Sequence, residues 1–347
     1  MATMSLSRRT AIRQVFTFAG AGAVSRLVAF NGLGRSVSAQ EPAADGAGPG
    51  VRLVLLGTQG GPNYNASRSE SASAVLVDGH PYLVDCGYGT LAALKAANVN
   101  HREVARVFLT HLHDDHTADL VALLGRQWTD GRVDPTDVFG PYGTSRLVEA
   151  ALAFGEANVA IRLVDEARSV NPADLQRGLD LEAPAGPVEV YRDERATVLA
   201  VENTHFPEAS KARMSYRSLS YRFDTRDRSI VFSGDTGYST GLVELARDAD
   251  VLVCEVMDVP AMRRAFEGMV SRGMYADNPE GIWRHIVETH TPVEEAGRMA
   301  AEAGVGMLVL THLVPGALAD FPDERYVAAA RKAFQGRIVV GRDLMEL

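Results

Sequence analysis

The stretch FLTHLHDDHTADL, residues 108–120, constrains the fold more than any other part of this chain. It holds three of the nine histidines and three aspartates, and it directly follows an apolar run typical of a strand. Because side chains alternate along an extended chain, His111 and His113 point to the same side. A turn immediately afterwards lets Asp115 and His116 face a second point nearby. A solvated polar loop would not need this spacing, which instead predicts a metal site at a strand end.

Such a site is completed by three more residues, which lie later in the chain. His205 in ENTHFP, Asp235 in FSGDTG and His312 in LTHLVP each follow a predicted strand, and loops at strand ends are where a rigid scaffold presents ligands. Imidazole and carboxylate groups suit zinc, manganese or iron, and two such ions ~3.5–4 Å apart can act together in hydrolysis. The sequence therefore predicts two divalent metal ions, with zinc the expected metal, held by seven residues: His111, His113, Asp115, His116, His205, Asp235 and His312.

Short apolar runs that alternate with turn signals and amphipathic stretches predict an α/β fold. The strands come in groups with helices after each group, an order typical of two sheets sandwiched between helix layers. Asp78-Gly79 predicts a hairpin turn, and residues 259–288 predict a helical insertion. The triplet Thr-His-Leu ends an apolar run twice, at 110–112 and at 311–313, which favours two related halves.

Residues 1–39 are typical of an export signal. They contain five arginines and no acidic residue, with the pair Arg8-Arg9 before a mildly apolar stretch and with Val37 and Ala39 placed for small-residue cleavage. This pattern predicts a twin-arginine signal peptide and a periplasmic or secreted protein; a plain N-terminal tail is the alternative. The apolar stretch is too short for a membrane span, which needs ~20 apolar residues. Residues 40–50 are predicted to be a linker and 51–347 one folded domain.

Charge and cysteine content narrow the partners. Without residues 1–39 the chain keeps 30 basic and 44 acidic residues, a formal charge of −14. A domain with this negative charge repels polyanions, and no run of Lys or Arg supplies a local basic patch. We therefore expect no nucleic-acid partner. Cys86 and Cys254 lie in apolar, strand-like runs and are predicted to be buried, reduced thiols rather than metal ligands.

The motif His-x-His-x-Asp-His, followed in order by His, Asp and His, resembles the metallo-β-lactamase fold superfamily across nearly all of residues 51–347. The resemblance implies a four-layer αββα sandwich that forms a hydrolase domain. It also implies that His111, His113 and His205 hold one metal, and that Asp115, His116 and His312 hold the other. Asp235 would bridge the two metals, and a bridging hydroxide would be the nucleophile.

The flanking segments LGTQGGP, DCGYGT and THTPVEEAG are similar to the ribonuclease Z-like branch of that superfamily, which includes alkyl- and arylsulfatase-type enzymes. In that branch the histidine of a His-Ser/Thr motif assists turnover, and His290 matches it here. The resemblance therefore implies two catalytic residues, Asp115 and His290. Asp85 would orient a ligand histidine, although an ordinary strand-end aspartate is the alternative. We expect His80, His101 and His285 to be structural, with only His285 a candidate for a substrate pocket.

These observations lead to the hypothesis of a dinuclear metal-dependent hydrolase of small esters, with aryl sulfates as the expected substrates. The alternatives are a β-lactam, lactone or phosphodiester hydrolase of the same fold, a tRNA 3′-processing endonuclease, and an iron-dependent persulfide-oxidising enzyme, because a fold does not fix a substrate. The expected partners are a small-molecule ester and no nucleic acid, while a homodimer is left open. Substrate choice is predicted to depend on the insertion at 259–288.

Overall fold

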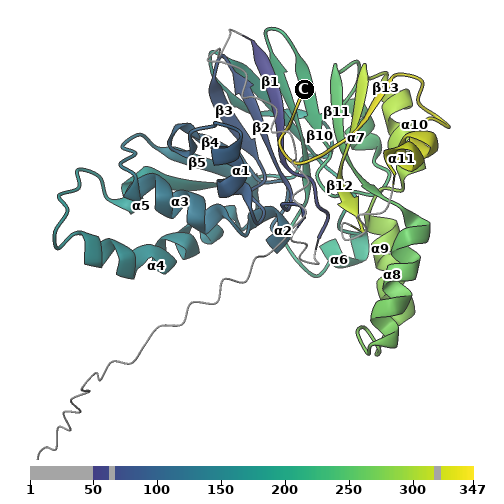
Figure 1. Cartoon of the computed structure of the whole chain (residues 1–347), viewed down its shortest axis with the longest axis horizontal. Helices are drawn as coiled ribbons and strands as arrows, with labels where there is room; N and C mark the ends of the chain where they lie inside the picture. Colours follow the sequence, from purple (N-terminus) through teal and green to yellow (C-terminus); the bar gives the residue numbers. More distant parts are fainter. Residues whose placement is uncertain (1–49, 62–66, 316–321) are drawn as a thin grey trace, which may run out of the picture. The chain divides into compact units, whose positions relative to one another are not determined.

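The computed structural model describes residues 50–61, 67–315 and 322–347 of the chain (Figure 1). The predicted signal peptide at 1–39, and all but Gly50 of the predicted linker, lie outside these residues, so both remain predictions. Within the described residues, no helix is both long enough and apolar enough to cross a membrane.

The first sheet contains seven strands in the order β14-β1-β2-β3-β4-β5-β6. The hairpin predicted at Asp78-Gly79 joins β2 to β3, and both turn residues have positive φ, 50° and 82°, as a two-residue hairpin loop of type I′ requires. From β3 to β6 the strands are parallel. The strands are β1 (Val51–Gly57), β2 (Ala72–Val77), β3 (His80–Val84), β4 (Arg106–Phe108), β5 (Thr136–Pro141), β6 (Gln176–Leu181) and β14 (Met345–Glu346).

The second sheet repeats this plan with seven strands in the order β13-β12-β11-β10-β9-β8-β7. Strands β10 to β13 are parallel, whereas β7 to β10 are antiparallel neighbours. The strands are β7 (Val188–Arg192), β8 (Ala196–Glu202), β9 (Leu219–Thr225), β10 (Ser229–Phe232), β11 (Val251–Met257), β12 (Met307–Val314) and β13 (Arg337–Val340).

The helices cover the outer faces of the two sheets, which confirms the predicted αββα sandwich. One buried cluster lies between the sheets, a second joins the first sheet to α1, α3 and α4, and a third joins the second sheet to α7, α10 and α11. The helices are α1 (Thr90–Ala96), η1 (His101–Glu103), α2 (Asp114–Thr117), α3 (Leu120–Thr129), α4 (Thr144–Arg162), α5 (Pro172–Leu175), α6 (Glu208–Lys211), α7 (Thr240–Leu245), α8 (Val259–Ser271), α9 (Pro279–Thr289), α10 (Val293–Ala303) and α11 (Asp323–Ala330).

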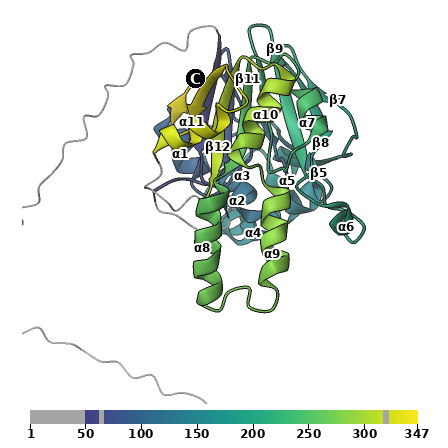
Figure 2. The same ribbon diagram turned by 90° about the vertical axis from the view of Figure 1, so that its right-hand side faces the viewer.

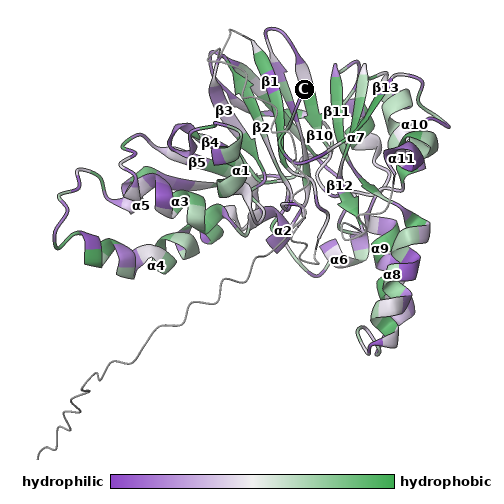
Figure 3. Cartoon of the chain, in the orientation of Figure 1, coloured by the Kyte–Doolittle hydropathy of each residue, from purple (hydrophilic) through white to green (hydrophobic). Residues whose placement is uncertain are grey.

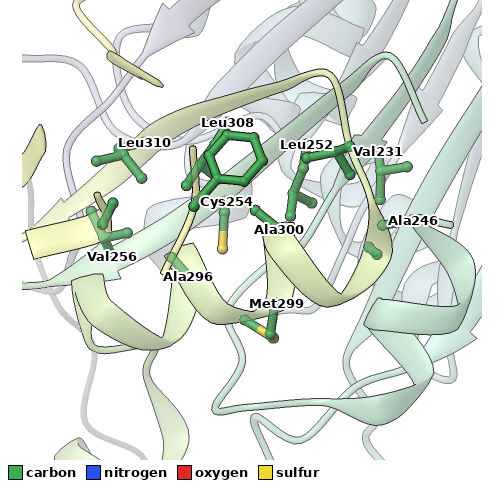
Figure 4. Packing of buried hydrophobic residues seen from close by; sticks show 14 of the residues in the cluster. Val231, Ala246, Leu252, Cys254, Val256, Ala296, Met299, Ala300, Leu308 and Leu310 are labelled. Atoms are coloured by element: carbon green, nitrogen blue, oxygen red, sulfur yellow. The ribbon is translucent and has the colours of Figure 1, made fainter. Parts of the chain in front are cut away.

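Small residues allow α10 to pack closely on the second sheet. Ala296 and Ala300 face the strands, and the thiol of Cys254 points into the same cluster (Figure 4). Cys86 and Cys254 are both buried and free, as predicted. Burial raises the pKa of both thiols, so both remain protonated, unreactive members of the core.

Helices α8 and α9 form an antiparallel hairpin that projects from one end of the sandwich (Figure 2). Figure 3 shows that both helices carry apolar and polar faces. The apolar face encloses a small cluster of its own, with Met262 and Phe266 buried against Met257 and Val314 at the ends of β11 and β12. The hairpin is therefore anchored on the same strand ends that carry the predicted ligands.

Candidate metal centre

The parallel strands position the centre because their carboxyl ends meet at one edge of each sheet. Residues 109–116 follow β4, Asp235 follows β10, and His312 lies near the end of β12. Two hydrogen bonds tie the sheets together beside it: the Tyr221 hydroxyl donates to the Leu109 carbonyl and the Leu219 amide donates to the Thr110 carbonyl, both at 2.8 Å. In Figure 1 the short helices α2 and α6 lie at this end of the strands, as do α8 and α9.

His111, His113 and His205 come together as what we call the three-histidine subsite. The Nδ1 of His113 lies 2.9 Å from the Nε2 of His111 and 3.3 Å from the Nε2 of His205. Burial lowers the pKa of all three imidazoles, to about 4 for His205. They are therefore neutral at pH 7, with lone pairs available to a cation.

Asp115, His116 and His312 form a second group, the mixed subsite. The Nε2 of His312 lies 3.2 Å from Asp115 Oδ2, and the Nε2 of His116 lies 3.7 Å from the same oxygen. Burial lowers the pKa of His312, but Asp235 and other carboxylates outweigh it and raise the value to about 10. Carboxylates raise the pKa of His116 in the same way. Burial alone would raise the pKa of Asp115, but His116 and His312 outweigh burial and lower it.

Asp235 lies between the two subsites. Its Oδ1 is 3.2 Å from both His116 Nε2 and His312 Nε2, and its Oδ2 is 4.0 Å from His111 Nε2. One carboxylate oxygen thus faces each group of ligands, which is the placement expected of a bridging residue. Burial alone would raise the pKa of Asp235, but His312 and His116 lower it well below the usual value, so the group is a carboxylate.

The donor set fits two divalent cations. His116 Nε2 and Asp235 Oδ1 are buried and form no hydrogen bond within the described part of the chain, although they lie close together. Buried polar atoms that form no hydrogen bond are costly and rare, and a cation beside this ion pair would give both atoms a ligand bond. Ring nitrogens and carboxylate oxygens of each subsite lie within 4.8 Å of one another, as ligands of one ion must. The structure thus brings all seven predicted residues together, while metal binding itself stays a prediction.

Two contacts fix the orientation of ligand histidines. Nδ1–H of His116 donates to Asp85 Oδ2 at 2.8 Å, the contact anticipated for Asp85. Asp85 also accepts hydrogen bonds from the Thr110 amide and hydroxyl, and it has a positive φ of 60°. On the other subsite, Nδ1–H of His205 donates to the Thr289 carbonyl at 3.1 Å. In both cases Nε2 is left to face the centre.

His312 reaches the centre through a bulge in β12. Glu255 of β11 pairs with Thr311 and Val256 pairs with Leu313, so His312 is the extra residue, and its φ is 44°. Bulges commonly re-aim a side chain beside an active site, and a left-handed non-glycine residue is tolerated only where its surroundings hold it. The Thr-His-Leu triplet therefore has different geometry at its two occurrences, because His111 follows the end of β4 rather than bulging from it.

Glu255 is a candidate functional residue that the sequence analysis missed. It is buried in β11, it accepts from the Thr236 amide at 2.6 Å, and its Oε2 accepts from Nδ1–H of His290 at 2.9 Å. Burial lowers the pKa of His290, but Glu255 outweighs it and the pKa is raised. This raised pKa favours the protonated form of His290 beside the predicted ligands. The available signal was a single acidic residue within the otherwise apolar run VLVCEVM.

A cavity of about 360 Å³ opens directly onto the centre. His113, His205, His290 and His312 line one side, and side chains of α8 and α9, including His285, line the other. His285 is therefore placed in the cavity, whereas His80 and His101 contact Asp78 and Asp130 elsewhere. The hairpin at 259–289 forms the wall expected to influence substrate choice.

A protein with this sandwich and this histidine–aspartate set at the strand ends falls in a class of metal-dependent hydrolases. Residues 80–313 match the family model described as the beta-lactamase superfamily domain. The chain belongs to the metallo-β-lactamase superfamily, in its ribonuclease Z-like branch. It is 31% identical over 299 residues to ribonuclease Z of Mycobacterium avium strain 104, covering 85% of this chain and 96% of the relative. Ribonuclease Z of Mycobacterium marinum is 33% identical over 299 residues, covering 85% and 97%.

Solved structures show the same fold. The metallo-beta-lactamase fold protein YhfI from Bacillus subtilis aligns with a TM-score of 0.59 at 19% identity, covering 86% of this chain and 99% of its own. The short form of human tRNase Z aligns with a TM-score of 0.58 at 22% identity, covering 85% and 98%.

The expectation of an aryl sulfate ester as substrate, with no nucleic acid as partner, is wrong. The relatives that match most of this chain are ribonucleases. The error lay in using the summed charge of −14, because a polyanion meets only the surface around the centre. Local basic groups exist despite that total: exposed Arg213, just after α6, and exposed Arg146, near the start of α4, form no ion pair within the described residues. Bound divalent cations would add further positive charge.

Proposed function

We propose that this protein is a metal-dependent endoribonuclease of the ribonuclease Z type, cleaving a phosphodiester bond in RNA, with precursor tRNA as the substrate to test. The observation that carries the proposal is the match to ribonuclease Z over 85% of the chain. The seven ligand-type residues and the Glu255–His290 pair support it, because each part needed for metal-assisted hydrolysis is present.

The ligand geometry indicates how the residues divide the work. The three-histidine and mixed subsites would hold one ion each. We expect zinc, because one set offers three imidazoles and the other offers a carboxylate and two imidazoles. When bound, the ions would supply Lewis-acid activation of the phosphodiester and water of lowered pKa. Asp115, itself a ligand, accepts a hydrogen bond from the Gly61 amide at 2.9 Å, which holds its carboxylate in place beside the cavity.

His290 is positioned to act as the general acid. Its Nδ1–H is held by Glu255, and Glu255 is held in turn by the Thr236 amide. This leaves Nε2 to carry the proton donated to the leaving oxygen of the cleaved bond, and the raised pKa of His290 favours the protonated ring. The ring lies 6.1 Å from His312 and 5.2 Å from His205, centroid to centroid, so it is adjacent to both subsites.

A pair of exposed tyrosines near the three-histidine subsite supports an RNA substrate. Tyr142 and Tyr216 are 56% and 45% exposed, and the centroids of their rings lie 6.0 Å apart. The side chains of Tyr216 and Leu112 both lie close to Gly143. Leu112 lies between His111 and His113 in the sequence, so the tyrosines are near this subsite. Exposed aromatic rings are typical of surfaces that bind single-stranded nucleic acid, because unpaired bases stack on them.

The test is cleavage of precursor tRNA by the zinc-loaded protein, with p-nitrophenyl sulfate as the comparison substrate. We expect RNA cleavage and no turnover of the sulfate. His290→Ala should keep the metal content of the wild type and lose ~10²–10⁴-fold in kcat. His101→Ala, which removes a partly exposed histidine paired with Asp130, is the matched control and should leave kcat unchanged. A fully metal-loaded protein that cleaves neither RNA nor any other phosphodiester would refute the proposal.

A further inference from the structure

The cavity has two chemically different sides. One side consists of the ligand histidines with Asp115 and Asp235, so a phosphodiester placed at the metals would lie along this side. The other side is the α8–α9 hairpin. Apart from the predicted ligands, His285 and His290, the described lining contains one ionisable acidic or basic side chain, Asp114. A group bonded to the phosphodiester that extends toward the hairpin therefore meets an uncharged surface.

The hairpin side is apolar and carries an aromatic ring. Met262 and Met269 of α8 face the cavity, as do Ile282 and Ile286 of α9. Tyr275, in the turn between the helices, also lines it, and its ring stacks on that of Phe266 at 5.8 Å with 14° between the planes. Since Phe266 is buried, it provides a fixed support for the Tyr275 ring.

The hairpin is held in place by several independent contacts. Asp258 caps α8 through the Ala261 amide, and the guanidinium of Arg325 lies 2.6 Å from the Asp258 carboxylate. The Arg263 guanidinium lies 4.9 Å from the Trp283 ring centroid, joining the two helices. The apolar wall is thus a built surface rather than a loose segment, and ligand pockets of this kind are usually largely pre-formed.

We propose that this wall is a base subsite, in which one unpaired nucleobase next to the cleaved phosphodiester packs against Met269, Ile286 and Tyr275. The inference rests on the proposed function and specifies its substrate class as single-stranded RNA at the cleaved bond. At about 360 Å³ the cavity is near the lower end of the range of ligand pockets, roughly 300–1,000 Å³. It is large enough for one nucleoside but not for a duplex, so the base must be unpaired to enter.

The chemistry of the wall favours a nucleobase that is held without sequence selection. Thioether, aliphatic and aromatic groups contact the flat face that all four bases share. Among the described lining residues of α8, α9 and their turn, only His285 and the Tyr275 hydroxyl offer polar atoms in their side chains. Bases should therefore bind with similar strength, with contact area rather than a hydrogen-bond pattern as the determinant.

The experiment uses two phosphodiester probes that share one leaving group, namely uridine 5′-(p-nitrophenyl) phosphate and methyl p-nitrophenyl phosphate. The wild-type protein, loaded with zinc, should prefer the uridine probe in kcat/KM. Met269→Gln places a polar group of similar size in the wall and should lower kcat/KM for the uridine probe ~10-fold or more, with little change for the methyl probe. Tyr275→Ala should act in the same direction.

The chain offers a matched control in Met274→Gln. Met274 is 42% exposed in the same turn and is not part of the cavity lining, so neither probe should be affected. Met269→Leu keeps the wall apolar, so this variant should retain the preference of the wild type for the uridine probe. Equal losses on both probes, or a wild type without preference for uridine, would overturn the base subsite while leaving the phosphodiesterase proposal intact. A wild type that cleaves neither probe nor RNA would overturn both.

Discussion

The two halves of the metal centre use different physical means to hold their ligands. In the three-histidine subsite, neutral imidazoles crowd together, and burial keeps their pKa values low. In the mixed subsite, carboxylates and histidines neutralise one another, and the pKa of His312 rises to about 10. The first set lacks charge until a cation arrives, whereas the second already contains an ion-pair network that a cation must replace.

The difference extends to the contacts behind each subsite. The backbone carbonyl of Thr289 holds His205, whereas the side chain of Asp85 holds His116. A backbone contact survives substitution, while a carboxylate can be removed by a single change. Mutations should therefore be able to weaken the mixed subsite selectively, which provides a direct way to test the comparison.

The largest effect is expected where the two subsites share a ligand. Asp235→Ala removes the carboxylate that faces both, so metal content should fall at both subsites together and RNA cleavage should be lost. His205→Ala and His312→Ala should each empty mainly one subsite. Elemental analysis of protein purified without chelators would measure this. If Asp235→Ala retained one full equivalent of metal, the residue would belong to one subsite only.

A smaller and one-sided effect is expected at Asp85. Asp85→Ala leaves the Nδ1 of His116 without its acceptor, so affinity at the mixed subsite should fall ~10–100-fold, as for other carboxylates behind ligand histidines. The three-histidine subsite should be unchanged. Competition with a chromophoric chelator would resolve the two affinities. As a control, Asp130→Ala removes an exposed carboxylate that pairs with the partly exposed His101, away from the centre.

Much of this centre could be predicted because its ligands follow apolar strands at short, regular spacing. The positions of His111, His113 and Asp115 depend on local backbone geometry, which alternation along an extended chain describes. Glu255 could not be predicted in the same way, because its role depends on His290, which is 35 residues away and reaches it only through the packing of β11 against the chain after α9. The bulge at His312 likewise depends on pairing with β11.

The substrate class was the least reliable prediction, for a related reason. Summed charge ignores where charges lie, and exposed basic side chains without an ion pair among the described residues, such as Arg146 and Arg213, are identified only in the folded chain. The helical insertion at 259–288 could be located from the sequence, but its position beside the predicted metal site depends on the anchoring of Phe266 and Met262 on Val314 and Met257.

The pH dependence of metal binding should separate the subsites further, with the smallest expected effect. In the metal-free protein His312 has a raised pKa of about 10 and His116 also has a raised pKa, so at pH 7 both carry protons that a metal must displace. Affinity at the mixed subsite should therefore increase with pH, roughly tenfold per pH unit for each proton released. The pKa values of the three-histidine subsite are lowered, so no proton is displaced there at pH 7, and its affinity should change little between pH 8 and 6.

Lowering the pH should consequently empty the mixed subsite first. Metal content after equilibration at pH 8, 7 and 6 in a metal buffer would show one ion lost before the other, and calorimetry in two buffers of different ionisation enthalpy would count the protons released. His312→Ala should flatten the pH dependence of what binding remains at the mixed subsite, because it removes one displaced proton, whereas His80→Ala, an exposed histidine in the β2–β3 turn, should not alter it. Simultaneous loss of both ions on acidification would mean that the shared carboxylate of Asp235 couples the subsites more strongly than their different protonation states separate them.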